Sequence, residues 1–368
     1  MKIRSVIIIL FSFLLFTGCN KSVGKQIPIS ELANDSGKFN SFLKNLMDKG
    51  IMLGHQDAVA FGYMWYGENN RSDVKSICGD LPAVIGWDLR RIETGSLINS
   101  DSVSFKDITE HIINMNLQGG ISVIKWCSDS PVKPSTYFIG KPDEMISSIL
   151  PNGVNHKEYL QGLDRLANFF LSLKDENGKF IPVVFNLFQN YNNSSSWWSS
   201  KYCTPQEYTQ LWTTTVNYLR HEKNIHHILY AYSVYAPLSM DVLNKTYPGN
   251  NYVDIIGTDI FLEFEKDIDG NTYKRNLNTS LNLITNFSKK HNKIPAITNT
   301  GLVGIKISNY FTNLVYPVIS KYKLSYILFE KNAWNIEEYY FIPIEGHPAS
   351  EDFVRFVNYP NILTCNKL

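Results

Sequence analysis

The 368-residue sequence has few charged residues and almost no charge imbalance. Charged residues make up 19% of the chain, and 35 basic against 34 acidic side chains leave a formal net charge of +1. Because binding to nucleic-acid phosphates requires a basic face, this balance argues against a nucleic-acid partner. No linker rich in Gly, Ser and Pro interrupts the chain after residue 36, so we expect one domain over residues 37–368.

Cysteine is also scarce, and its spacing excludes the common zinc motifs. Besides Cys19, the chain has only Cys78, Cys127, Cys203 and Cys365. The adjacent His226 and His227 lack metal-ligand spacing as well. The sequence therefore predicts neither a metal site nor a cofactor. In an oxidising compartment the four cysteines could form one or two disulfides, and their spacing does not choose among the three pairings.

Long apolar runs are rare, and the clearest one lies near the start of the chain. Residues 6–16 are apolar except for Ser12, follow Lys2 and Arg4, and lead to Thr17, Gly18 and Cys19. The run is too short to cross a bilayer comfortably, and its layout is that of a cleaved export signal. The small residue before Cys19 resembles the lipobox of bacterial lipoproteins.

We therefore expect a signal peptide over residues 1–18, a lipid on Cys19 that anchors the chain to a membrane, and a polar spacer over residues 19–36. An ordinary secretory signal is the alternative. The expected location is the cell envelope, on the periplasmic side or the outer surface of the outer membrane. Asn20 and Lys21 follow Cys19 where surface-exported lipoproteins often have acidic residues, which favours the periplasmic side.

Aromatic residues, in contrast, are plentiful at 13% of the chain. Tyr63, Trp65 and Tyr66 lie together in one polar segment, and Trp197 and Trp198 in another. Exposed aromatic side chains are suited to stacking on sugar rings, whereas core filling is the alternative for each of them.

Short apolar runs rich in β-branched residues recur eight times, and segments of helical periodicity follow them. They span residues 51–53, 83–87, 121–126, 181–188, 228–234, 253–259, 294–298 and 324–329. This alternation predicts parallel strands joined by helices, and the eightfold repeat favours an α/β fold with a single (β/α)8 TIM barrel. No glycine-rich phosphate loop follows the first strand, which removes the main support for a nucleotide-binding sheet.

Two helices are readable in more detail. An apolar stripe at spacings of three and four predicts an amphipathic helix, and it consists of Leu160, Leu163, Leu166, Ala167, Phe170 and Leu171. Thr204, Pro205 and Glu207 form the pattern of a capping box with proline at the first helical position.

In such a barrel the chemistry lies where the strands end at their carboxyl side. The residues expected there are His55, Asp57, Asp88, Trp126, Cys127, Gln189, Asn190, Asp259, Phe261, Asn299, Glu330 and Lys331, with Asp129 close by. At these positions the sequence resembles glycoside hydrolase family 26, the retaining endo-β-1,4-mannanases. Matching segments lie at residues 54–57, 71–74, 78–89, 147–151, 203–212, 247–259, 294–298 and 346–356.

The resemblance fails at the two residues that would carry the reaction. The family has a catalytic acid/base glutamate after a histidine at the end of the fourth strand, where this chain has Gln189 and Asn190. The family's nucleophile glutamate, at the end of the seventh strand, is replaced by Asn299. An amide neither donates a proton as an acid nor attacks a sugar as a carboxylate. Loss of acid catalysis alone costs about 10²–10⁴ in rate, so the resemblance implies a catalytically inactive or strongly impaired barrel.

Further positions depart from the family in the same region. Cys127 stands in place of a histidine, Phe261 in place of a tyrosine and Ser195 in place of a tryptophan. Glu330 and Lys331 replace a tryptophan and an arginine. The site around the scissile bond is therefore rebuilt.

Three functions stay open at this point. The first is binding of a β-mannan-type oligosaccharide without cleavage, with contacts from His55, Tyr63, Trp126, Gln189, Trp197, Trp198 and Phe261. The second is an active mannan endo-1,4-β-mannosidase whose carboxylates have moved, with Glu330 acting beside Asp259 or Asp129. The third is a non-catalytic interaction subunit of a polysaccharide-utilisation system, in which the cleft contacts a protein.

Overall fold

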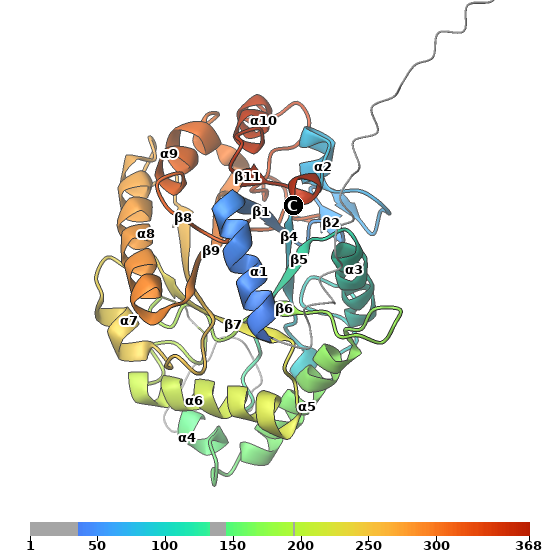
Figure 1. Ribbon diagram of the computed structural model, residues 1–368, viewed down its shortest axis with the longest axis vertical. Coiled ribbons are helices and arrows are strands. Elements are labelled where there is room, and N and C mark those ends of the chain that lie inside the picture. Colours follow the sequence, from blue (N-terminus) through green and yellow to red (C-terminus); the bar gives the residue numbers. More distant parts are fainter. Residues whose placement is uncertain (1–35, 133–144, 194–195) are drawn as a thin grey trace, which may run out of the picture.

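The computed structural model describes residues 36–132, 145–193 and 196–368, and within them eight parallel strands close into a barrel (Figure 1). The barrel strands are β1 (Ile51–Gln56), β4 (Val84–Asp88), β5 (Ile121–Lys125), β6 (Val183–Asn186), β7 (Ile228–Tyr235), β8 (Ile255–Leu262), β9 (Ile294–Leu302) and β10 (Tyr326–Phe329). Pairing of β10 with β1 closes the cylinder. The predicted (β/α)8 barrel is confirmed, and each strand overlaps its predicted range.

Helices surround the barrel in the order of the chain (Figure 1). They are α1 (Ser36–Lys49), α2 (Asp73–Cys78), α3 (Phe105–Leu117), α4 (Met145–Ile149), α5 (His156–Ser172), α6 (Pro205–Asn217), α7 (Asp241–Thr246), α8 (Asn271–His291), α9 (Tyr316–Ile319) and α10 (Ser350–Val357). Short helical turns are η2 (Ile92–Thr94), η3 (Tyr218–Glu222), η4 (Val303–Ile305), η5 (Tyr310–Val315) and η6 (Cys365–Lys367). Among the described residues, no helix has both the length and the apolar character needed to cross a membrane.

Both helices read in detail from the sequence form as predicted. In α5 the residues Leu163, Leu166 and Phe170 are fully buried. At the start of α6, the Thr204 hydroxyl accepts a hydrogen bond from the Glu207 backbone N–H, and the Glu207 carboxylate accepts one from the Thr204 backbone N–H. These local patterns succeed because capping and one-sided burial depend on residues within a few positions of each other.

Four described elements, β2 (Phe61–Gly62), β3 (Trp65–Tyr66), β11 (Ile362–Leu363) and α1, lie outside the eightfold prediction. Strands β2 and β3 form a small antiparallel hairpin after β1, and β11 pairs with the start of β1. Helix α1 lies across the amino-terminal end of the barrel, at the centre of Figure 1. Its apolar face contributes Phe39, Leu43 and Leu46 to the cluster that fills the barrel interior.

None of the disulfides that the sequence left possible is formed, since the four cysteines that the structure describes are all free thiols. Each thiol makes its own contact: Cys78 donates to the Val74 carbonyl, Cys203 to the Trp198 carbonyl and Cys365 to the Gln118 carbonyl. The sulfur of Cys127 accepts a hydrogen bond from Gln189. Cys19, the predicted signal peptide, the spacer up to residue 35, and Ser195 lie outside the described residues.

Candidate functional site

Buried polar and charged side chains gather where the barrel strands end, opposite the end that α1 covers. The fully or almost fully buried ones are His55, Gln56, Asp57, Asp88, Lys125, Asn186, Asp259, Thr298 and Asn299. Buried polar groups require partners, so their pairing determines what this end of the barrel can do.

Asn190, at the predicted acid/base position, is bonded to a carboxylate of another strand. Its Nδ2 donates to Asp259 Oδ2 at 2.7 Å, and the Thr298 hydroxyl donates to Asp259 Oδ1 at 2.6 Å. Burial raises the pKa of Asp259, which the charge of Lys125 and these two hydrogen bonds oppose. Asn190 has a φ of 60°, a left-handed conformation that asparagine adopts more readily than most residues.

Asn299, at the predicted nucleophile position, has an equivalent partner. Its Nδ2 donates to Glu330 Oε2 at 2.6 Å. The Lys125 ammonium lies 3.8 Å from the same oxygen and donates to Gln56 Oε1 at 2.6 Å. Although burial opposes ionisation, Lys125 and Lys331 together hold the pKa of Glu330 below its usual value. Glu330 is therefore an ionised carboxylate held beside the Asn299 amide.

A second group of carboxyls lies around Lys331. The Lys331 ammonium forms an ion pair with Asp101. Burial, with added repulsion from Asp101, raises the pKa of Asp57 well above its ordinary value and also raises the pKa of Asp88. Across the part of the chain that the structure describes, no group of His, Cys, Asp and Glu side chains is arranged to hold a metal ion.

Several buried acceptors in the site have no hydrogen-bond partner among the described residues. They are Gln189 Oε1, Asn190 Oδ1 and Asn299 Oδ1. Burial lowers the pKa of His55 to about 4, so its imidazole is neutral at pH 7. Because unpaired buried polar groups are costly, the three amide oxygens are suited to binding a ligand or water that donates hydrogen bonds.

The expected exposure of Trp197 and Trp198 is wrong, because both side chains are fully buried. Trp198 packs against Phe188 with ring centroids 5.4 Å apart, and its Nε1 donates to the Gln189 carbonyl at 2.9 Å. Trp126 is 2% exposed and donates to Glu93. Each indole finds a partner for its N–H while its rings fill the core, which is the alternative that the sequence left open.

The remaining predicted contacts lie at the edges of the site. Tyr63 is half-buried, with its ring 5.0 Å from that of Tyr340 in an edge-to-face arrangement. Phe261 is half-buried, with its ring 6.0 Å from that of Phe341. Asp129 forms an ion pair with Arg90 at 2.8 Å, so its carboxylate is already neutralised.

Two features of the site were missed from the sequence. Lys125 is central to the pairing, and a lone charge inside the apolar run at 121–126 was the signal for it. A cavity of about 370 Å³ lies beside Lys331 and is partly lined by the half-buried Trp334 and Tyr339. These aromatic residues belong to the loop after β10, which carries no periodic pattern from which their placement could be predicted.

Comparison with known proteins finds the same architecture in characterised enzymes. Residues 30–314 match the sequence model of the family described as "Glycosyl hydrolase family 26". A GH26 β-mannanase from Bacteroides ovatus superposes with a TM-score of 0.86 at 35% identity, covering 92% of this chain and 95% of that one. A modular endo-β-1,4-mannanase from Cellulomonas fimi gives a TM-score of 0.81 at 25% identity, covering 94% of this chain and 77% of that one.

Curated relatives match over part of their length. A mannan endo-1,4-β-mannosidase of Bifidobacterium adolescentis is 26% identical over 299 residues, covering 78% of this chain and 29% of that protein. A mannan endo-1,4-β-mannosidase of Bacillus subtilis is 26% identical over 208 residues, covering 54% of this chain and 55% of that protein. The alignments thus reach only about a third to a half of these relatives.

Proposed function

Because the chain belongs to glycosyl hydrolase family 26, we propose that it is a glycan-binding member that holds a β-mannan-type oligosaccharide without hydrolysing it. The observation that carries this proposal is the pairing of the two amides. Asn190 and Asn299 each donate their amide hydrogen to a neighbouring carboxylate and keep a buried carbonyl oxygen without a partner among the described residues.

Hydrolysis by the family's mechanism needs two carboxyl groups about 5 Å apart, one as nucleophile and one as acid and then base. Neither position has a carboxyl group here. The carboxyl group bonded to Asn190 is that of Asp259, which accepts hydrogen bonds at both oxygens and is 1% exposed. It therefore offers no proton to a glycosidic oxygen in the cleft.

Binding needs different properties, and these are present. Sugar hydroxyls donate hydrogen bonds, and the free amide oxygens of Gln189, Asn190 and Asn299 accept them. The half-buried Trp334 and Tyr339 give the cleft an aromatic wall beside Lys331. The described site can thus bind a sugar through the positions that other family members use for chemistry.

The test measures binding and cleavage in the same preparation. We expect calorimetry to detect binding of mannotetraose, and a reducing-end assay on galactomannan to detect no hydrolysis. Gln189→Ala should weaken binding about threefold to tenfold, because it removes one acceptor. Absence of binding to every mannan, glucan and xylan oligosaccharide tried would refute the proposal and favour the interaction-subunit hypothesis.

Restoring the lost glutamates tests whether the cleft still orients a mannan. In the double variant Asn190→Glu, Asn299→Glu, the second substitution brings a new carboxylate against Glu330, whose Oε2 lies 2.6 Å from Asn299 Nδ2. We therefore expect the triple variant that also carries Glu330→Gln to hydrolyse galactomannan faster than the double variant. Equal activity of the double and triple variants would show that Glu330 does not interfere with a carboxylate at position 299.

A second candidate function is hydrolysis through Glu330. It is favoured by the lowered pKa of Glu330, since an ionised carboxylate at this place has the charge of a nucleophile. Neither of the acids expected to act with Glu330 is available, because Asp259 accepts hydrogen bonds at both oxygens and Asp129 is paired with Arg90. Wild-type cleavage of galactomannan that disappears in Glu330→Gln would establish this function in place of the first.

We also propose that a lipid on Cys19 anchors the barrel in the cell envelope, as the lipobox-like residues 17–19 suggest. The chain expressed in a bacterial host should incorporate radiolabelled palmitate and partition with membranes. The Cys19→Ser variant should do neither. Labelling of the variant would contradict the proposal.

A further inference from the structure

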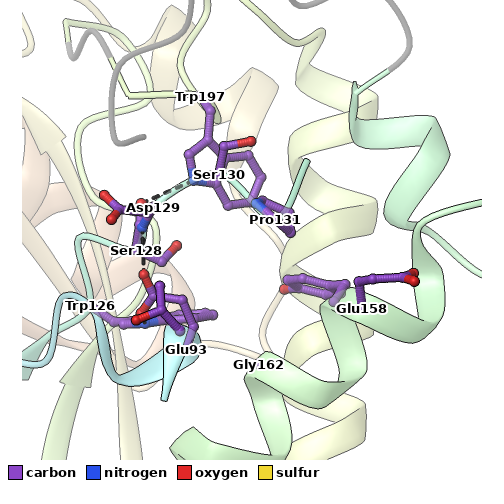
Figure 2. Close-up of a pocket in the computed structure, with 11 residues that line it drawn as sticks. Glu93, Trp126, Ser128, Asp129, Ser130, Pro131, Glu158, Gly162 and Trp197 are labelled. Atoms are coloured by element: carbon purple, nitrogen blue, oxygen red, sulfur yellow. Dashed lines mark hydrogen bonds between the residues drawn. The ribbon is translucent and has the colours of Figure 1, made fainter. Parts of the chain in front are cut away.

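A cavity of about 240 Å³ lies beside the cleft, between the loop that follows β5 and the helix α5 (Figure 2). We propose that this cavity binds one uncharged sugar residue of the glycan, an inference that rests on the proposed function. Its wall includes Glu93, Ser128, Asp129, Tyr159, Glu158 and Trp197.

Ser128 supplies a fixed hydroxyl that is without a hydrogen-bond partner among the described residues. The residue is 1% exposed, and its Oγ is buried and unpaired. Its backbone carbonyl accepts a hydrogen bond from Trp197 Nε1 at 3.1 Å, which holds the segment in place. Figure 2 shows Ser128 on the β5 side of the cavity, facing α5. A buried hydroxyl without a partner is costly, so a ligand that bonds to it would remove that cost.

The acidic side chains of the cavity are also fixed. Glu93 accepts from Trp126 Nε1 at 2.9 Å and from the Asp129 backbone N–H at 2.7 Å. Burial raises the pKa of Glu93, against these two hydrogen bonds. The Asp129 carboxylate is oriented by Arg90 at 2.8 Å. Each oxygen of a carboxylate can accept more than one hydrogen bond, so these groups can still receive donors from a ligand.

The charge of the cavity determines the class of ligand. Among the described residues that line it, the polar groups are carboxylates and hydroxyls, and none is a Lys, Arg or His. Such a surface favours a ligand with many hydrogen-bond donors and disfavours uronic acids and sulfated sugars. The rings of Trp126, Tyr159 and Trp197 also line the cavity, with at most 2% of each residue exposed. A neutral pyranose, with hydroxyls around a ring that has apolar faces, has this combination of properties.

Ser128→Ala tests the cavity, and Ser288→Ala is the matched control. Ser288 lies on α8, is also 1% exposed, and has an Oγ that is equally unpaired among the described residues. We expect Ser128→Ala to weaken mannotetraose binding about threefold to tenfold by calorimetry, as loss of one hydrogen bond does. Ser288→Ala should bind as wild type does. Both should melt at the wild-type temperature or slightly above it, because each loses a buried hydroxyl that has no partner among the described residues.

Glu158→Arg tests the same cavity from the opposite side. Glu158 is exposed on α5, so its replacement should not disturb the fold. A long cationic side chain there should obstruct the cavity and weaken mannotetraose binding at least as much as Ser128→Ala does.

The outcomes separate the two proposals. If wild type binds mannotetraose and Gln189→Ala weakens binding, while Ser128→Ala and Glu158→Arg change nothing, the cavity proposal is wrong and the cleft proposal stands. An equal loss in Ser288→Ala would also overturn the cavity proposal, because the effect would then be general. If wild type binds no glycan, both proposals fail.

Discussion

The two ends of the barrel are built from the same strands and have opposite chemistry. At the amino-terminal end, α1 covers an interior of fully buried apolar side chains, among them Leu43, Val84, Val123 and Leu229. At the carboxyl-terminal end, buried carboxylates, amides and Lys125 bond to one another and leave several acceptors unpaired. The apolar end stabilises the fold, whereas the polar end keeps hydrogen-bond acceptors that have no partner among the described residues.

Strand β5 shows the change within a single element. Ile121 and Val123 join the apolar cluster under α1, and Lys125, two residues further along the same inward face, joins the charged network. A barrel can therefore concentrate polar groups at one end while the other end maintains stability. This division allows the polar end to vary while the fold is kept.

The largest effect should come from breaking the apolar end. Leu43→Ala removes a fully buried side chain from the helix that covers the barrel. We expect the free energy of unfolding to fall by about 2–5 kcal/mol in urea denaturation. Leu117→Ala, at a position 58% exposed, should change it little. Mannotetraose affinity measured on the folded protein should be unchanged in both variants, and a loss in Leu43→Ala would show that the two ends are coupled.

A smaller effect should follow from removing the cation of the polar end. Lys125→Met removes the donor to Gln56 Oε1 and the ammonium 3.8 Å from Glu330, and leaving a buried acceptor without its donor should destabilise the fold by about 1–3 kcal/mol. The double variant with Glu330→Gln should recover part of that loss, because the Glu330 carboxylate is then no longer left without its ammonium. A double variant as unstable as the single one would show that the lost bond to Gln56 or packing of the Lys125 stem, and not the charge pair, is what matters.

The smallest effect should be a gain in thermal stability when a carboxyl group whose ionised form is disfavoured by burial is replaced. Because the folded-state pKa of Asp57 is raised well above its ordinary value, its ionisation opposes folding as the pH rises above that value. Asp57→Asn should therefore melt a few degrees higher than wild type at pH 8, and the difference should vanish below pH 4. Asparagine also suits the φ of 54° at this position.

Melting curves across this pH range check the Asp57 prediction, with the exposed Asp241→Asn as the control. A difference for Asp57→Asn that is constant with pH would mean that the gain does not come from the charge.

Much of the fold was predictable because it depends on local pattern. The strand runs, the α5 stripe and the Thr204 capping box were each readable from nearby residues, and the structure confirms them. The replacements at Asn190 and Asn299 were likewise visible from the resemblance. The partners of these amides were not, because Asn190 and Asp259 are 69 residues apart in the chain, and Asn299 and Glu330 are 31 apart.

The sequence alone thus determined the barrel and the absence of glutamate at two of its strand ends. Only the tertiary structure decided that Trp197 and Trp198 are buried, that the described cysteines are free, and that each amide is bonded to a carboxylate of another strand. The physical reason is the distance along the chain between the residues that interact. Periodicity and capping act over a few residues, whereas burial and hydrogen-bond pairing at a barrel's end depend on side chains that closure of the sheet brings together.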